Sequence, residues 1–306
     1  MIDEKWNSIG GSDIAAIMEM SPYATGFDVW ARIKGGFQQH ESPVMRRGKL
    51  FEPVLRTIAR EDYHLDTLGP KEYRWTFDGV PMRASIDDAV QNQADKSLEI
   101  IEYKTVSPFT SHNWEDGVPE HYEIQCQWYL AAAQASRAHV LALIGLDDVR
   151  HYVVEGDVAL QRNMVEKAIQ FWRRFVAGDE RPTPGKSKLA KAYFDNRYPG
   201  INDEVAIAGT EEDASRLISY GVAQTQIKEA EERLEELKNY FRARLAQSTK
   251  LVTSYGTLTY SAAGMRETVD WQAIAKELNA SPELIAKHTT EKPTARVMRA
   301  KVDGAK

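Results

Sequence analysis

The sequence has 306 residues and a formal net charge of −6, with 42% hydrophobic and 27% charged residues. This composition is ordinary for a globular protein with material for one large domain or two smaller ones. No run of about 18 apolar residues occurs, and the N-terminal residues do not form a signal peptide, so the sequence predicts a cytoplasmic protein. The acidic balance argues against a protein that coats polyanions without specificity, although an enzyme needs positive potential only where nucleic acid runs.

The first part of the chain predicts helices and strands in mixed order. Helices are expected over residues 12–18, 27–34, 45–61, 120–134 and 158–176. Strands are expected as a hairpin over 75–86 with its turn at Asp78-Gly79, a strand around Glu102, a buried strand over 138–144 and its hairpin partner over 150–154. Ser12 is the expected N-cap of the first helix, and the buried face of the third is expected to carry Leu50, Val54, Leu55 and Ile58. Strands flanked by helices, joined partly by hairpins, predict an α/β fold with a central mixed sheet.

A stretch rich in proline and glycine, 182–188, marks the expected edge of a first domain over residues 1–185. The second domain, 205–306, begins with a long helix whose apolar residues recur at spacings of three and four: Ile227, Ala230, Leu234, Leu237, Phe241 and Leu245. A hairpin over 251–260, a helix over 270–278 and a basic strand over 296–302 complete a smaller α+β unit. The apolar stripe of the long helix and the basic C-terminal end predict that this domain mediates assembly, DNA binding or partner binding. The alternative is that the stripe packs against the first domain.

Asp87, Glu102 and Lys104 form the most informative pattern in the chain. Side chains alternate along a strand, so Glu102 and Lys104 lie on one face, and the predicted hairpin delivers Asp87 nearby. Two carboxylates and an ammonium at a sheet edge suit Mg²⁺ held by oxygen ligands, with a lysine beside the attacking water. This local pattern alone supports a metal-dependent phosphodiesterase and a surface ion-pair cluster about equally. Asp88 is the alternative carboxylate to Asp87.

Further motifs occur in a fixed order along roughly the first half of the chain: Ile9-Gly10-Gly11-Ser12-Asp13-Ile14, Ser21-Pro22-Tyr23, Arg47-Gly48-Lys49-Leu50-Phe51-Glu52-Pro53, Ala84-Ser85-Ile86-Asp87, Glu102-Tyr103-Lys104 and Tyr122-Glu123-Ile124-Gln125-Cys126-Gln127. With these motifs the chain resembles the lambda-exonuclease/YqaJ branch of the PD-(D/E)XK nucleases. The family's usual Pro-Asp-Gly is Ile86-Asp87-Asp88 here. The resemblance implies a restriction-endonuclease-like core and a Mg²⁺-dependent double-strand DNA exonuclease, with Mn²⁺ able to substitute.

The resemblance also implies roles for individual residues. Asp87, Glu102 and the backbone carbonyl of Tyr103 would bind the metal, and Lys104 would orient or activate the attacking water. Glu52 would approach the metal through water, with a solvated helix glutamate as the alternative. Gln125 would hydrogen-bond near Lys104 or the scissile phosphate. Gln127 lies two residues later, on a different face of the helix, and would be structural.

Residues expected to contact the DNA end lie mostly near the N-terminus. Ser12 falls where relatives hold the 5′-phosphate, and Arg46 and Arg47 are candidates for backbone contacts, with a solvated helix start as the alternative. The lambda-type enzyme has an arginine seven residues before this serine, whereas this chain has Lys5. Lysine binds phosphate as a point charge and not bidentately, so only a weak preference for a 5′-phosphate is expected.

Other cofactors are not expected. The single cysteine, Cys126, leaves no set of thiolates for an iron–sulfur cluster. The histidines show no close metal-ligand spacing, and no Gly-rich phosphate loop occurs, so neither zinc nor ATP is predicted.

Through the resemblance, the expected activity removes one strand 5′→3′ and leaves a 3′ overhang for a single-strand annealing protein. The expected setting is a phage or prophage protein that forms a homo-oligomer, a trimer by resemblance, on double-stranded DNA ends. A structure-specific endonuclease on the same fold and a DNA-binding module with a decayed site are the alternatives.

Overall fold

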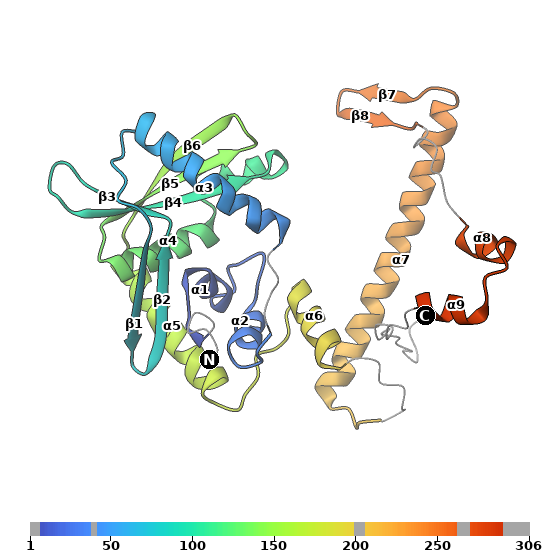
Figure 1. Cartoon of the computed structure of the whole chain (residues 1–306), viewed down its shortest axis with the longest axis horizontal. Coiled ribbons are helices and arrows are strands. Elements are labelled where there is room, and N and C mark those ends of the chain that lie inside the picture. Colours follow the sequence, from blue (N-terminus) through green and yellow to red (C-terminus); the bar gives the residue numbers. More distant parts are fainter. Residues whose placement is uncertain (1–6, 38–41, 199–205, 262–269, 290–306) are drawn as a thin grey trace. The chain divides into compact units, whose positions relative to one another are not determined.

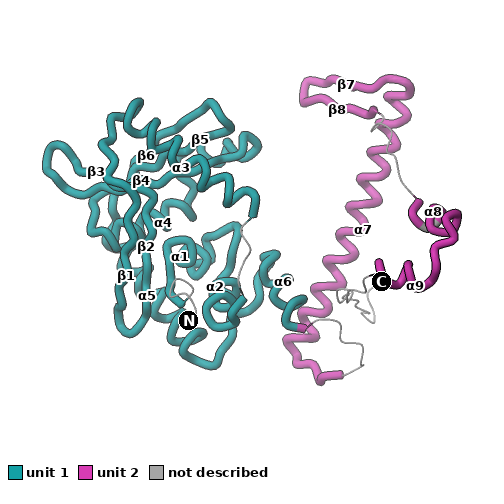
Figure 2. Tube along the Cα trace, viewed as in Figure 1, with its two compact units in different colours: residues 1–197 teal, residues 198–306 magenta. Residues whose placement is uncertain are grey.

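The computed structural model describes residues 7–37, 42–198, 206–261 and 270–289. The chain divides into two compact units, Met1–Arg197 and Tyr198–Lys306 (Figure 2). Each unit is described by itself. Within the described residues, no helix is both long enough and apolar enough to span a membrane.

Unit 1 is a mixed α/β structure (Figure 1). Its helices are α1 (Gly11–Ile17), α2 (Gly26–Ile33), α3 (Pro43–Glu61), the 3₁₀ helix η2 (Pro108–Trp114), α4 (Glu120–Ala133), α5 (Val158–Phe171), the π-helical turn η3 (Trp172–Val176) and α6 (Lys188–Arg197). Its strands are β1 (Lys71–Phe77), β2 (Val80–Ile86), β3 (Asp88–Gln91), β4 (Leu98–Val106), β5 (Arg137–Ile144) and β6 (Asp148–Glu155). The central sheet has the order β3-β4-β5-β6, with β4 and β5 parallel and the other neighbours antiparallel. A central mixed sheet flanked by helices confirms the predicted fold class.

The hairpin β1–β2 forms where the sequence predicts it. Phe77 pairs with Val80 across the turn, and both turn residues, Asp78 and Gly79, have positive φ angles of 51° and 76°. Two left-handed residues make the turn whose twist matches that of the flanking strands, and Asp-Gly supplies it at low cost. The hairpin thereby sets the direction of the chain where β2 ends and Asp87 follows.

The sheet separates two apolar cores. Ile100 of β4 contributes to the larger core, which includes residues of α1, α2, α4 and α5, whereas Ile101 and Tyr103 contribute to a smaller core with Leu55 and Ala59 of α3. The predicted buried face of α3 was therefore partly wrong. Leu50 is 66% exposed and Val54 is also exposed, because the edge of α3 that meets the sheet is defined by the pair Leu55 and Ala59, four residues apart.

The N-terminus of α1 also differs from its prediction. The N-cap is Gly10, which has no side chain to cap the helix, and Asp13 accepts a hydrogen bond from the Gly10 amide at 2.7 Å, as the N3 residue of a capping box does. The prediction that Ser12 is the N-cap was wrong: Ser12 is exposed within the first turn. A side chain at Gly11 would lie 2.4 Å from the ring of Tyr129, so glycine is what lets α1 approach α4 this closely.

Unit 1 continues beyond residue 185, where the sequence predicts its edge, because α6 packs on α2. The rings of Tyr193 and Phe194 each lie 5.4 Å from the ring of Phe27, and Tyr193 also contacts Trp30. Tyr193 and Phe27 are buried. An aromatic cluster of this kind contributes both buried area and ring–ring contacts to stability.

Unit 2 contains α7 (Glu211–Leu245), β7 (Lys250–Thr253), β8 (Gly256–Thr259), α8 (Trp271–Glu277) and α9 (Pro282–His288). The long helix, the hairpin and the helix after it lie where the sequence predicts them. The helix α9 was not predicted. The predicted basic strand over 296–302 lies outside the described residues.

Replacing Tyr193 by alanine should destabilise unit 1 by about 3 kcal/mol, because the substitution removes a buried ring from the cluster on α2. Urea denaturation of the full chain measures this loss. The matched control is Phe109→Ala, at a ring that is 91% exposed and should contribute little. Equal stabilities for the two variants would show that α6 is not part of the cooperative unit.

Candidate active site

The strand pairing places Asp87 beside β4. The ladder between β3 and β4 ends at the pair Asp88–Ile101, so the Tyr103 amide has no partner in β3. Asp87 Oδ2 accepts a hydrogen bond from that amide at 2.9 Å. Because side chains alternate along β4, Glu102 and Lys104 share the face of Ile100, which belongs to the larger core. The three residues predicted from the sequence therefore meet at one edge of the sheet.

Asp87 and Glu102 form a close pair of carboxyl groups. Glu102 is only 2% exposed, and its Oε2 atom is buried with no hydrogen-bond donor among the described residues. Asp87 is near enough to Glu102 for its charge to act on the pKa of Glu102. Burial and the neighbouring Asp87 raise the pKa of Glu102 to about 8, and burial also raises the pKa of Asp87. The pair therefore needs a proton or a cation at neutral pH.

Lys104 is the cation already present beside this pair. Its Nζ donates hydrogen bonds to Glu102 Oε1 and, at 3.2 Å, to Gln125 Oε1, and it lies 4.7 Å from the centre of the Tyr122 ring. Burial opposes its charge, but the carboxylates of Glu102 and Asp87 hold the pKa of Lys104 above its ordinary value. Lys104 is therefore an ammonium donor in this structure and not a neutral base.

The helix α4 fixes the position of Lys104. Gln125 Nε2 donates to the Tyr129 hydroxyl at 2.7 Å, while its Oε1 accepts from Lys104. Gln127 instead donates to the backbone carbonyl of Glu155 at 2.7 Å, so it joins α4 to the end of β6. Tyr122 and Tyr129 were not singled out from the sequence. Their spacing from Gln125, three residues before and four after, is the signal that could have found them.

Asp88 occupies a separate environment. Its carboxylate is fully buried and accepts from Arg56 Nε at 2.5 Å, from the Gly69 amide at 2.7 Å and from the Tyr103 hydroxyl at 3.2 Å. Both oxygens are thus used within the protein, whereas Asp87 faces Glu102. Arg56, which the sequence did not point to, also donates to the Asp87 carbonyl at 3.1 Å and so joins the two aspartates.

Glu52 approaches the pair from α3. It is half-buried, and burial together with the charge of Asp87 raises its pKa, while Lys104 acts in the opposite direction. In the part of the chain that the structure describes, no three His, Cys, Asp or Glu side chains are arranged to hold a metal ion. Glu52 is thus within electrostatic reach of Asp87 without completing such a cluster.

This donor set is suited to a hard divalent cation. Carboxylate oxygens from two residues, one of them buried without a donor, are the ligands that Mg²⁺ uses when it keeps several of its waters. The expectation that the Tyr103 carbonyl is a further ligand stays a prediction.

The residues predicted to contact DNA have fewer contacts with the site around Asp87 and Glu102. Ser12 is exposed and follows Gly11, which packs against Tyr129 and Gln125. Arg46 and Arg47 are exposed near the start of α3. Lys5 lies outside the described residues.

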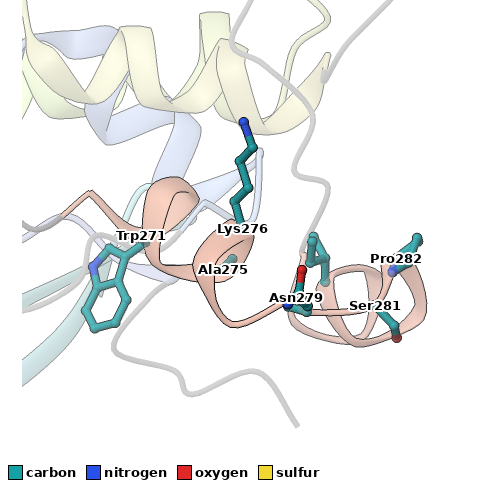
Figure 3. Close-up of a pocket in the computed structure, with 8 residues that line it drawn as sticks. Trp271, Ala275, Lys276, Asn279, Ser281 and Pro282 are labelled. Atoms are coloured by element: carbon teal, nitrogen blue, oxygen red, sulfur yellow. The ribbon is translucent and has the colours of Figure 1, made fainter.

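Unit 2 contains a hollow between α8 and α9 (Figure 3). It is lined by small, apolar and amide side chains together with one lysine: Trp271, Ala275, Lys276, Asn279, Ala280, Ser281, Pro282 and Ile285. No acidic residue lines it, so it offers no carboxylate ligands for a metal.

Residues 4–136 match the family of the YqaJ-like viral recombinase domain. This segment of the chain is therefore similar to the YqaJ-like viral recombinase domain. The match confirms the resemblance drawn from the motifs, and every predicted site residue from Lys5 to Gln125 lies within it.

The chain is also similar to known proteins. The chain is 26% identical over 252 residues to the Bacillus subtilis (strain 168) protein YqaJ, a match that covers 78% of this chain and 75% of the relative. Two solved structures are also similar. The alkaline exonuclease LHK-Exo from Laribacter hongkongensis is 18% identical, with a TM-score of 0.47, over 57% of this chain and 90% of its own. A phage-related exonuclease from Haemophilus somnus 129PT is 14% identical, with a TM-score of 0.40, over 56% and 95%.

The raised carboxyl pKa values predict how stability depends on pH. The pKa of Glu102 is about 8 in the folded protein against an ordinary value of 4.5, so the folded state binds a proton more tightly than the unfolded state. Without divalent metal, thermal stability should therefore fall as pH rises from about 5 to about 8. Mg²⁺ or Mn²⁺ should offset the fall, because a bound cation replaces the proton.

Thermal unfolding in EDTA and in excess Mn²⁺, at several pH values, measures this effect. Glu102→Gln should flatten the pH dependence in EDTA and reduce the metal effect. The control is Asp95→Asn, at an exposed loop carboxylate. A wild-type melting temperature that is constant over this pH range and unchanged by metal would contradict the paired-carboxylate site.

Proposed function

We propose that this chain is a divalent-metal-dependent deoxyribonuclease that degrades double-stranded DNA from its ends. The YqaJ-like domain supports a nuclease of the viral recombinase type. The observation that supports the chemistry most strongly is the buried carboxyl pair of Asp87 and Glu102, with the ammonium of Lys104 hydrogen-bonded between Glu102 and Gln125. We propose Mg²⁺ as the metal, with Mn²⁺ able to substitute.

In this proposal Asp87 and Glu102 hold the metal, and Glu52 contributes through water. The cation, when bound, supplies a water activated for attack on phosphorus and neutralises charge on the phosphate. Lys104, kept protonated by the carboxylates, donates hydrogen bonds toward the attacking water or a phosphate oxygen and stabilises charge that develops there. Gln125 fixes the direction of Lys104, and the hydroxyl of Tyr129 fixes Gln125 in turn. Such preorganisation lowers the cost of reaching the transition state.

We further propose that cleavage proceeds 5′→3′ and leaves a 3′ overhang for a single-strand annealing protein. This polarity, the annealing partner and the threefold ring expected of a homo-oligomer come from the resemblance and stay predictions. A structure-specific endonuclease on the same fold is the second candidate. Covalently closed plasmid DNA separates the two, because an exonuclease leaves it intact and an endonuclease nicks it.

Asp87→Asn and Glu102→Gln should each lower the rate of cleavage of linear duplex DNA by about a thousandfold or more, because each removes a proposed metal ligand. Lys104→Ala should be comparably severe. Asp95→Asn is the matched control and should retain full activity. The assay follows Mg²⁺-dependent release of nucleotides from duplexes labelled at the 5′ or the 3′ end.

Asp88→Asn separates the two neighbouring aspartates. Because Asp88 binds Arg56 and not the carboxyl pair, this variant should lose stability, yet any folded fraction should still require metal and still cleave. Substantial turnover by folded Asp87→Asn, with loss of turnover in folded Asp88→Asn, would reverse the assignment.

The DNA end should be recognised only weakly through its 5′-phosphate, since Lys5 stands where the lambda-type enzyme has an arginine. We expect a modest difference in rate between linear DNA with 5′-phosphate and with 5′-hydroxyl ends. A preference of about a hundredfold, about 2.7 kcal/mol, would show that other cations replace the arginine.

A further inference from the structure

The helix α7 carries a regular apolar seam. It is 35 residues long, and apolar residues alternate along it at spacings of three and four: Tyr220, Ala223, Ile227, Ala230, Leu234, Leu237 and Phe241. This is the a and d pattern of successive coiled-coil heptads. The large side chains at its centre remain about half exposed, with Leu234 at 51% and Leu237 at 48%. A seam of this kind is covered when a second helix lies along it.

We propose that α7 pairs with the α7 of a second copy of this chain as an antiparallel coiled coil. In one register, Leu234 lies opposite the partner's Leu237, and Ala230 lies opposite the partner's Phe241. Twofold symmetry repeats both layers, so a small residue faces a large one at each end of the four-layer core. Pairing a small side chain with a large one favours close packing between two helices.

The charges beside the seam favour this register. Glu231 and Lys238 occupy the same flanking position of successive heptads, and in the antiparallel pair Glu231 of each chain faces the partner's Lys238. On the other flank, Arg233 faces the partner's Tyr240, an arrangement suited to a cation–π contact. Within one chain, Lys238 Nζ also lies 3.5 Å from Glu235 Oε2, so Lys238 would be shared between Glu235 and the partner's Glu231.

Other arrangements bring like charges together. A parallel pair would place Arg233 against the partner's Lys238. An antiparallel pair shifted by one heptad would place Glu231 against the partner's Glu231, and Arg233 against the partner's Arg233. Like charges facing each other across a helix pair disfavour both alternatives. Among pairings of two α7 helices, the charges therefore favour the antiparallel orientation and the register proposed here.

An antiparallel pair is closed and twofold symmetric, because each chain presents the same surface to the other. It is thus a different contact from the threefold ring proposed for the nuclease activity, and it does not depend on that activity. It would link two chains through unit 2 whichever surfaces unit 1 uses.

Charge exchange on the full-length chain tests this proposal, with self-association measured by sedimentation equilibrium. Glu231→Lys and Lys238→Glu should each weaken association about tenfold, because each turns two attractive pairs into two repulsive ones. The double variant E231K/K238E should restore wild-type association. An equimolar mixture of the two single variants should also restore it, as mixed dimers. In about 1 M salt the differences should shrink.

Glu229→Lys is the matched control, because residue 229 lies away from the seam and its reversal should leave association unchanged. Circular dichroism verifies that each variant keeps its helix content. A monomeric wild type would overturn the proposal. So would an assembly that responds to neither single variant, which would indicate other surfaces. Stronger self-association of the Lys238→Glu variant would indicate a parallel pair. Unchanged self-association of that variant would indicate the shifted register. Either result would overturn the antiparallel register proposed here.

Discussion

The structure of the site depends on one electrostatic constraint, the burial of two neighbouring carboxyl groups beside a single lysine. Asp87 and Glu102 are both charged at neutral pH only if positive charge lies near them. The single positive charge of Lys104 balances one of their two negative charges. Removing charges from water is costly, so such a cluster persists only where the fold strongly fixes it. Here β4 supplies two of the three groups by strand alternation, and the end of the β3–β4 ladder supplies the third.

Other parts of unit 1 follow from this arrangement. Arg56 binds Asp88 and the Asp87 backbone, which fixes the turn that presents Asp87 to Glu102. Gln125 and Tyr129 extend the hydrogen-bond chain from Lys104 to α4, and Gly11 lets α1 approach that helix. The hydrogen bonds of this network favour one geometry, because each bonded group loses a partner if any member moves, and Glu102 Oε2 is the buried oxygen that they leave without a donor. The same rigidity is what a metal-dependent phosphodiesterase requires of its ligands.

The sequence predicted the parts of the site that depend on local periodicity. Glu102 and Lys104 share a face because a strand alternates, and Gln125 and Gln127 diverge because a helix does not bring residues two apart together. Features decided by tertiary contacts were missed. The cap of α1 depends on Asp13 reaching back to Gly10, and the exposure of Leu50 depends on which edge of α3 meets the sheet. The different environments of Asp87 and Asp88 depend on Arg56, which lies 31 residues earlier in the chain than Asp87.

The most direct test of the central claim is anomalous diffraction from crystals of the protein grown with Mn²⁺. The account predicts a manganese peak between the carboxylates of Asp87 and Glu102, with Glu102 Oε2 among its ligands and Asp88 still bound to Arg56. A protein that crystallises with Mn²⁺ bound elsewhere, or with Lys104 alone neutralising an empty carboxylate pair, would contradict it.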